Sequence, residues 1–152
     1  MNAKVILLIE DNPSDRDLTR RALERAHISN QLIVAEDGEE GLDYLFGRGQ
    51  HDGRDPYDLP TVVLLDINLP KLNGLEVLQR IRANEITRLL PVVMLTTSDQ
   101  EQHVVASYNL GANSYIRKPV DFQQFAEAIH NWGIYWLLLS EIPTGSEVPV
   151  GK

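Results

Sequence analysis

The chain has 152 residues, no cysteine, a formal net charge of −8 at pH 7 and a sequence pI of about 4.9. That length fits one domain with a sizeable core, the lack of cysteine excludes disulfides, thiolate catalysis and cysteine-based zinc sites, and the acidic balance argues against nucleic-acid binding. Because acidic residues come within the first dozen positions and no apolar run approaches the roughly 20 residues that span a bilayer, we expect a cytoplasmic protein with neither a signal peptide nor a membrane partner.

Five short, mainly apolar runs have the composition of buried strands: residues 4–9, 31–35, 62–66, 91–95 and 114–117. The segments between them carry apolar residues at helical spacing. We predict helices over about 13–27, around 41–46, around 75–81, from 99 to about 110, and over about 121–140. Strands and helices that alternate in this way imply a mostly parallel sheet with helices on both faces.

The sequence also predicts the ends of the fourth helix and the character of one long connection. Asp99 is placed as the N-cap of the fourth helix, and Gly111 follows its expected end as a C-cap. Residues 47–60, which are rich in Gly, Asp, His and Pro, are interpreted as a solvated loop.

Residues with reactive side chains lie at the ends of four of the five predicted strands. Glu10 and Asp11 follow the first, Asp66 is the last residue of the third, Thr96 follows the fourth and Lys118 the fifth. Considered alone, Asp66 could as well be an exposed residue at a strand end, or a helix cap, as a functional carboxylate. Ligands of open α/β sheets bind outside the carboxyl ends of the strands, so the five side chains together predict a site at this edge.

The side chains at this edge favour phosphoryl transfer. Three carboxylates repel one another unless a cation or a proton intervenes, and oxygen-only ligands favour a hard ion such as Mg²⁺. A metal ion and an ammonium neutralise phosphoryl oxygens, while a carboxylate can attack as the nucleophile. Asp66 is the predicted nucleophile because it is the isolated carboxylate, set between the acidic pair and Thr96/Lys118.

These motifs resemble the receiver domain of two-component response regulators over about residues 4–140. The matching segments are Ile9-Glu10-Asp11-Asn12, Leu65-Asp66-Ile67-Asn68-Leu69-Pro70, Asn73-Gly74, Leu95-Thr96-Thr97-Ser98 and Lys118-Pro119. The resemblance implies a flavodoxin-like (CheY-like) doubly wound α/β fold, a five-stranded parallel sheet in the order 2-1-3-4-5. It also implies a signalling protein that catalyses only its own phosphorylation and dephosphorylation.

The resemblance assigns roles residue by residue. Asp66 becomes the phosphoacceptor, and Asp11, Asp66 and the main-chain carbonyl of Asn68 become Mg²⁺ ligands, with Glu10 as the other half of the acidic pair. Mn²⁺ or Ca²⁺ could substitute in this site.

Three further roles concern the response to phosphorylation. Thr96 is the switch hydroxyl that turns toward the phosphoryl group, and Lys118 is the ammonium that pairs with that group. Tyr115 falls at the rotating aromatic switch position, and the peptide bond between Lys118 and Pro119 is expected to be cis.

Less specific motifs resemble those of the phytochrome-associated subgroup of this family. They are the run Leu-Thr-Thr-Ser-Asp at 95–99, Asp43-Tyr44-Leu45 before the long loop, and Tyr135-Trp136-Leu137. The implied partner is a histidine kinase, specifically a bacteriophytochrome. Residues 1–141 would form the receiver domain and 142–152 a C-terminal tail, in a stand-alone regulator that acts through protein contacts.

The last predicted helix carries more apolar surface than one buried face requires. We expect homodimerisation through this helix and the neighbouring strand region, with the tail as a possible arm across the partner. The alternative is that the tail folds back over the same surface. The residues assigned to the dimer interface are Trp132, Tyr135, Trp136 and Leu139.

Two other classes of protein share parts of this pattern. A dehalogenase-type phosphatase with an Asp nucleophile needs a second carboxylate two positions later, where this chain has Asn68. A flavodoxin-like flavin carrier needs a phosphate loop rich in Ser, Thr and Gly after the first strand. Here Glu10-Asp11-Asn12-Pro13 would repel phosphate without a metal.

Overall fold

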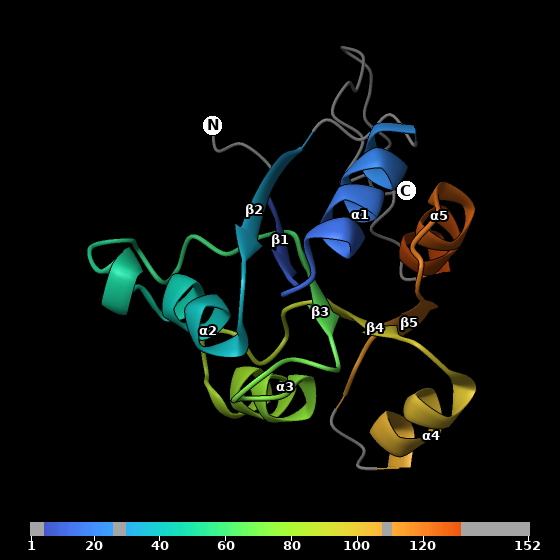
Figure 1. The fold of residues 1–152 in the computed structure, drawn as a ribbon. Helices are drawn as coiled ribbons and strands as arrows, with labels where there is room; N and C mark the ends of the chain where they lie inside the picture. The colour runs from blue at the N-terminus through green and yellow to red at the C-terminus, as the bar shows by residue number, and fades with distance from the viewer. Residues whose placement is uncertain (1–4, 26–29, 108–110, 132–152) are drawn as a thin grey trace.

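The computed structural model describes residues 5–25, 30–107 and 111–131, and within them the chain forms a doubly wound α/β fold (Figure 1). The strands are β1 (Val5–Ile9), β2 (Gln31–Ala35), β3 (Val62–Asp66), β4 (Val92–Thr96) and β5 (Ser114–Arg117). They form one parallel sheet in the order β2-β1-β3-β4-β5. The helices are α1 (Pro13–Arg25), α2 (Gly38–Phe46), the 3₁₀ turn η1 (Gly49–His51), α3 (Gly74–Ala83), α4 (Asp99–Ser107) and α5 (Phe122–Asn131). The predicted fold class and strand order are confirmed.

Helices cover both faces of the sheet (Figure 1), and the sheet divides the core into two clusters. Alternate residues of each central strand point to opposite faces. In β1, Leu7 and Ile9 pack in the cluster that includes residues of α2, α3 and α4, while Ile6 and Leu8 pack in the cluster with α1 and α5. The central strands β1, β3 and β4 are therefore buried on both sides, which explains why the sequence shows continuous apolar runs there.

Helix α4 begins one residue differently from the prediction. Asp99 is the first helical residue, and the cap is Ser98, whose Oγ accepts a hydrogen bond from the main-chain N–H of Glu101 at 3.2 Å. The prediction of Asp99 as N-cap was therefore wrong. Either residue type can cap a helix, and the sequence alone does not distinguish two adjacent candidates.

The segment between α2 and β3 is a largely exposed loop, as predicted, and it includes the short turn η1. Arg54 donates to the main-chain carbonyl of Tyr44 at 2.7 Å and to that of Asp58, and its guanidinium lies 3.9 Å from the centre of the Tyr44 ring. His51 meets the same ring edge-on at 5.2 Å. One arginine and one tyrosine thus fasten this loop to the end of α2.

The ends of three predicted helices extend beyond the residues that the structure describes. Helix α1 is described to Arg25, α4 to Ser107 and α5 to Asn131. The predicted interface residues Trp132, Tyr135, Trp136 and Leu139, and the tail 142–152, lie outside the described residues. Among the helices within the described ranges, none has the length and apolar character needed to span a bilayer.

Candidate functional site

The register of the sheet brings the predicted site residues to the edge formed by the carboxyl ends of the strands. Ile9 lies opposite Leu65, so Glu10 and Asp66 each come next on adjacent strands, and Asp66 itself pairs with Leu95 of β4. Thr96 ends β4, and Lys118 directly follows β5. Glu10, Asp66 and Thr96 are buried, whereas Asp11 is exposed. The juxtaposition that the sequence predicted is therefore present.

Three carboxylates form the centre of this edge. One oxygen from each of Glu10, Asp11 and Asp66 lies within 4.8 Å of the others. Burial, and then the negative charge of Asp66, raises the pKa of Glu10 from 4.5 to about 7, although Lys118 and the N–H of Asn12 act in the opposite direction. The charge density of the cluster is thus high enough to retain a proton near neutral pH or to attract a cation.

Lys118 lies among the carboxylates as their ammonium partner. Its Nζ atom is 3.2 Å from Oδ2 of Asp66, 3.3 Å from Oε1 of Glu10 and 3.0 Å from Oδ2 of Asp15. Burial acts to lower the pKa of Lys118, but the hydrogen bond that Lys118 donates to Asp15 and the charges of Asp66 and Glu10 outweigh it and raise that pKa. Lys118 is therefore positively charged at neutral pH. Its peptide bond to Pro119 is cis, as expected.

Asn68 connects the centre of the site to the start of α4. Its main-chain N–H donates to Oδ1 of Asp66 at 3.1 Å, and its side-chain amide donates to Oε2 of Glu101 at 2.6 Å. The other oxygen of Glu101 accepts from the N–H of Thr97 at 2.7 Å. Burial acts to raise the pKa of Glu101, but these hydrogen bonds and the charge of Lys118 lower it.

Tyr115 lies in β5, the outermost strand beyond β4. It pairs with Met94 of β4 and packs, partly buried, against the core cluster that contains residues of α2, α3 and α4. Burial raises the pKa of its hydroxyl.

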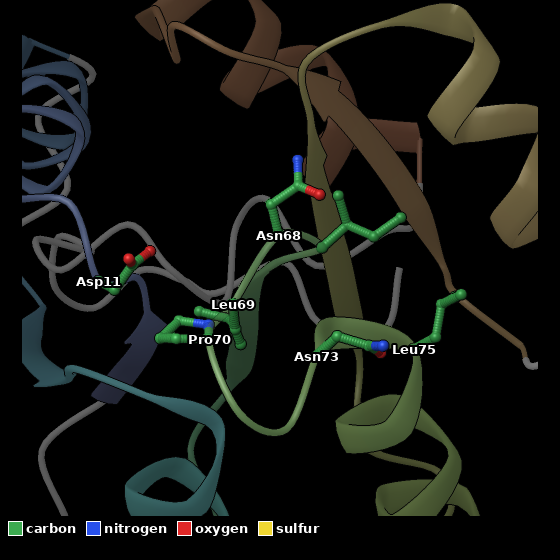
Figure 2. Close-up of a pocket in the computed structure, with 7 residues that line it drawn as sticks. Asp11, Asn68, Leu69, Pro70, Asn73 and Leu75 are labelled. Carbon is green, nitrogen blue, oxygen red and sulfur yellow. The ribbon is translucent and has the colours of Figure 1, made fainter.

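The donor set fits a hard divalent cation. Every candidate ligand is an oxygen, and the carboxylate of Asp11 is exposed, so one side of the cluster is open to water. Beside it lies an open pocket of about 530 Å³, where Asp11 faces the segment between β3 and α3 (Figure 2). The pocket is lined by Asp11, Ile67, Asn68, Leu69, Pro70, Asn73 and Leu75.

Two residues of the site were not predicted from the sequence. Asp15 falls at the start of the first predicted helix, and Glu101 falls within the fourth, without a role in the site being assigned to either. Both contacts join segments that are distant in the chain, because Asp15 meets Lys118 and Glu101 meets Asn68. The only local signal for Asp15 is its position in the first turn of α1, close after the acidic pair.

Comparison with known proteins identifies the class. The response regulator receiver domain family matches residues 6–130, so the chain belongs to this family and is a receiver of a two-component system. Among curated relatives, the response regulator Rcp1 of Synechocystis sp. is 36% identical over 140 residues, which cover 92% of this chain and 93% of Rcp1.

Solved structures place the chain near phytochrome-associated regulators. The bacteriophytochrome response regulator RtBRR is 51% identical, with a TM-score of 0.86 over 95% of this chain and 87% of that one. The Mn²⁺-bound form of Rcp1 is 35% identical, with a TM-score of 0.70 over 93% and 99% of the two chains. The phosphorylated cyanobacterial phytochrome response regulator RcpA is 33% identical, with a TM-score of 0.71 over 94% and 100%. The predicted likeness to this subgroup is confirmed.

Proposed function

We propose that Asp66 accepts a phosphoryl group from the phosphohistidine of a histidine kinase. A carboxylate oxygen of Asp66 forms the new O–P bond, while the N–P bond breaks and the imidazole nitrogen keeps the electron pair and takes a proton. The observation that carries this proposal is the position of Lys118, 3.2 Å from Oδ2 of Asp66 within a cluster of three carboxylates. Its fixed charge offsets the negative charge that the transferred group brings.

The proposed metal ligands are the carboxylates of Asp11 and Asp66 and the main-chain carbonyl of Asn68, with Glu10 beside them. Mg²⁺ bound there would neutralise the phosphoryl oxygens, and Mn²⁺ or Ca²⁺ would fit the same oxygen donors. The Mn²⁺-bound structure of the relative Rcp1 supports a divalent ion in this family's site. The protein's own part is to hold one carboxylate oxygen from each of Glu10, Asp11 and Asp66 within 4.8 Å of the others and to leave Asp11 accessible.

The signal is proposed to leave the site through a change in the segments around it. A phosphoryl group adds about −1.5 to −2 charges at pH 7 and three acceptor oxygens. Thr96 is buried at the end of β4 and would turn its hydroxyl toward these oxygens, Lys118 would pair with them, and the ring of Tyr115 would move inward. The new surface would then be recognised by other proteins.

A bacteriophytochrome kinase is the proposed phosphoryl donor in the cytoplasm, because the similar solved structures include regulators of that group. We further propose a homodimer through the last helix, with residues 142–152 as an arm in addition to the receiver domain of residues 1–141. Sedimentation of the full chain with and without phosphorylation tests the dimer. A monomer at micromolar concentration in both states would rule it out.

Intact-mass spectrometry after incubation with Mg²⁺ and a small-molecule phosphodonor tests the central proposal. We expect the wild type, but not the Asp66→Asn variant, to gain one phosphoryl group, about 80 Da, and EDTA to abolish the gain. No gain in the wild type, or an equal gain in the variant, would contradict the assignment of Asp66. Transfer from a phosphorylated bacteriophytochrome, compared with transfer from an unrelated histidine kinase, then tests the partner.

The two alternative classes receive no support. The matched family is that of receivers, and the position that a dehalogenase-type phosphatase fills with an acid is Asn68, whose amide is bound to Glu101. A flavin phosphate would meet the carboxylates of Glu10 and Asp11 after β1.

A further inference from the structure

Glu101 joins the two segments that follow β3 and β4. One oxygen of its carboxylate accepts from the main-chain N–H of Thr97 at 2.7 Å, and the other accepts from the side-chain amide of Asn68 at 2.6 Å. Thr97 directly follows the proposed switch residue Thr96, and Asn68 contributes a proposed metal ligand. A single carboxylate therefore ties together the two segments on either side of Asp66.

Comparison of α4 with α3 indicates that the contacts of Glu101 do more than cap a helix. In α3, Glu76 occupies the third helical position and returns to the N–H of its own cap Asn73, an ordinary capping box. Glu101 has the equivalent position in α4, behind the cap Ser98. Its two oxygens instead contact the residue before the cap and a separate segment of the chain, so the side chain links segments rather than only ending a helix.

Phosphorylation would act on this link through Asn68. The main-chain N–H of Asn68 is 3.1 Å from Oδ1 of Asp66, while the amide of the same residue holds Glu101. A phosphoryl group on Asp66 would add negative charge to the carboxylate that the Asn68 main chain contacts and would repel the Glu101 carboxylate held by the Asn68 side chain. The same group needs hydrogen-bond donors, and Glu101 occupies two that lie nearby.

We propose that Glu101 is a positioning residue, a latch that holds the β3–α3 and β4–α4 segments together in the unphosphorylated protein and releases them on phosphorylation. This inference rests on the proposed function of Asp66. A ligand shifts a conformational equilibrium only by its differential affinity for the two states. Removing the latch therefore favours the released state and strengthens binding of a phosphoryl mimic at Asp66.

The test uses beryllium fluoride with Mg²⁺ as the phosphoryl mimic on the full chain. We measure its dissociation constant by calorimetry for the wild type, Glu101→Ala, Glu101→Gln and the control Asp99→Asn. Asp99 lies in the same turn of α4 and carries the same charge, but its partner is Arg117 at 3.6 Å. We expect about twofold to fivefold tighter binding for Glu101→Ala, in keeping with an exposed charged contact, a smaller change for Glu101→Gln and none for Asp99→Asn.

The side-chain amide of Asn68 gives a signature that general destabilisation would not produce. In the wild type its proton signal should lie downfield, because the amide donates to a carboxylate, and should move upfield when the mimic binds. The Glu101→Ala variant should show the upfield position from the start. An Asn68 signal that does not respond, or equal dissociation constants in all the proteins, would overturn the latch alone. A wild type that binds no mimic would overturn the proposed function together with it.

Discussion

The Nζ atom of Lys118 lies 3.2 Å from Oδ2 of Asp66, with only 10% of the first side chain and 2% of the second exposed. Lys118 also contacts Glu10, whose side chain is fully buried, and Asp15 on α1. One ammonium thus compensates several carboxylates that the fold has removed from water. A buried charge left without its partner strongly destabilises the folded state, so stability and the proposed chemistry depend on the same contact.

Replacing Lys118 by methionine is therefore expected to lower the free energy of unfolding at pH 8 by about 3 kcal/mol, within the range for breaking a buried ion pair. Urea unfolding in EDTA measures the change. Arg117→Met is the control, because Arg117 is exposed and lies 3.6 Å from the exposed Asp99, a pair worth less than about 1 kcal/mol. Equal losses in both variants would show that the buried cluster does not need its cation.

The pKa of Glu10 predicts how the stability of the metal-free protein depends on pH. Because folding raises this pKa from 4.5 to about 7, mainly through burial, the folded state binds more protons than the unfolded state between these values. The contribution of Glu10 to stability is then complete below about pH 4.5 and is lost as the pH rises through about 7. The free energy of unfolding should fall less between pH 5 and 8 in Glu10→Gln than in the wild type.

Urea unfolding of both proteins at pH 5 and pH 8 in EDTA measures this difference. Comparing the two proteins cancels the pH dependence that comes from the titratable groups they share. Mg²⁺ at pH 8 should raise the stability of the wild type more than that of Glu10→Gln, since a bound cation relieves the repulsion that ionised Glu10 creates. Identical pH dependence in the two proteins would show that Glu10 titrates normally.

Asp11 is the exposed member of the carboxylate cluster, so replacing it should weaken Mg²⁺ binding with little effect on the free energy of unfolding. Asp11→Asn is expected to raise the Mg²⁺ dissociation constant by roughly tenfold or more, because even residues that only support a ligand affect metal affinity on that scale. Calorimetry at pH 8 provides the measurement. Asp15→Asn is the matched control, since Asp15 contacts Lys118 but lies outside the group of three carboxylates. A larger effect at Asp15 than at Asp11 would contradict the proposed ligand set.

The sheet and the site at its edge could be predicted from the sequence because both follow from local patterns. Each central strand is buried on both faces and is therefore continuously apolar, and the position after each strand is fixed once the strand is recognised. Parallel pairing then brings Glu10, Asp66, Thr96 and Lys118 to the same edge, whatever connects the strands.

Contacts between side chains of distant segments could not be predicted in this way. Arg54 fastens the loop after α2 by reaching the Tyr44 ring and carbonyl, and Arg82 donates to the carbonyl of Gly111 at 2.7 Å. Glu101 reaches Asn68 across the edge of the sheet. Each contact depends on the tertiary fold and on one rotamer of a long side chain, and nothing in the adjacent sequence specifies either partner.

Gly74 holds the end of β3, and therefore Asp66, against the start of α3. Its N–H donates to the carbonyl of Ile67 at 3.0 Å, and a Cβ atom there would strike the main-chain oxygen of Asp66 and lie 2.6 Å from Cα of Ile67. Gly74→Ala should therefore lower the free energy of unfolding by about 1–3 kcal/mol and displace Asp66, slowing its phosphorylation in mass-spectrometric time courses. The control Gly53→Ala strains a loop residue at φ +96° with no neighbouring atom within 4 Å, so it should lose stability without slowing phosphorylation. Equal phosphorylation rates in the two folded variants would show that Asp66 does not depend on this close approach.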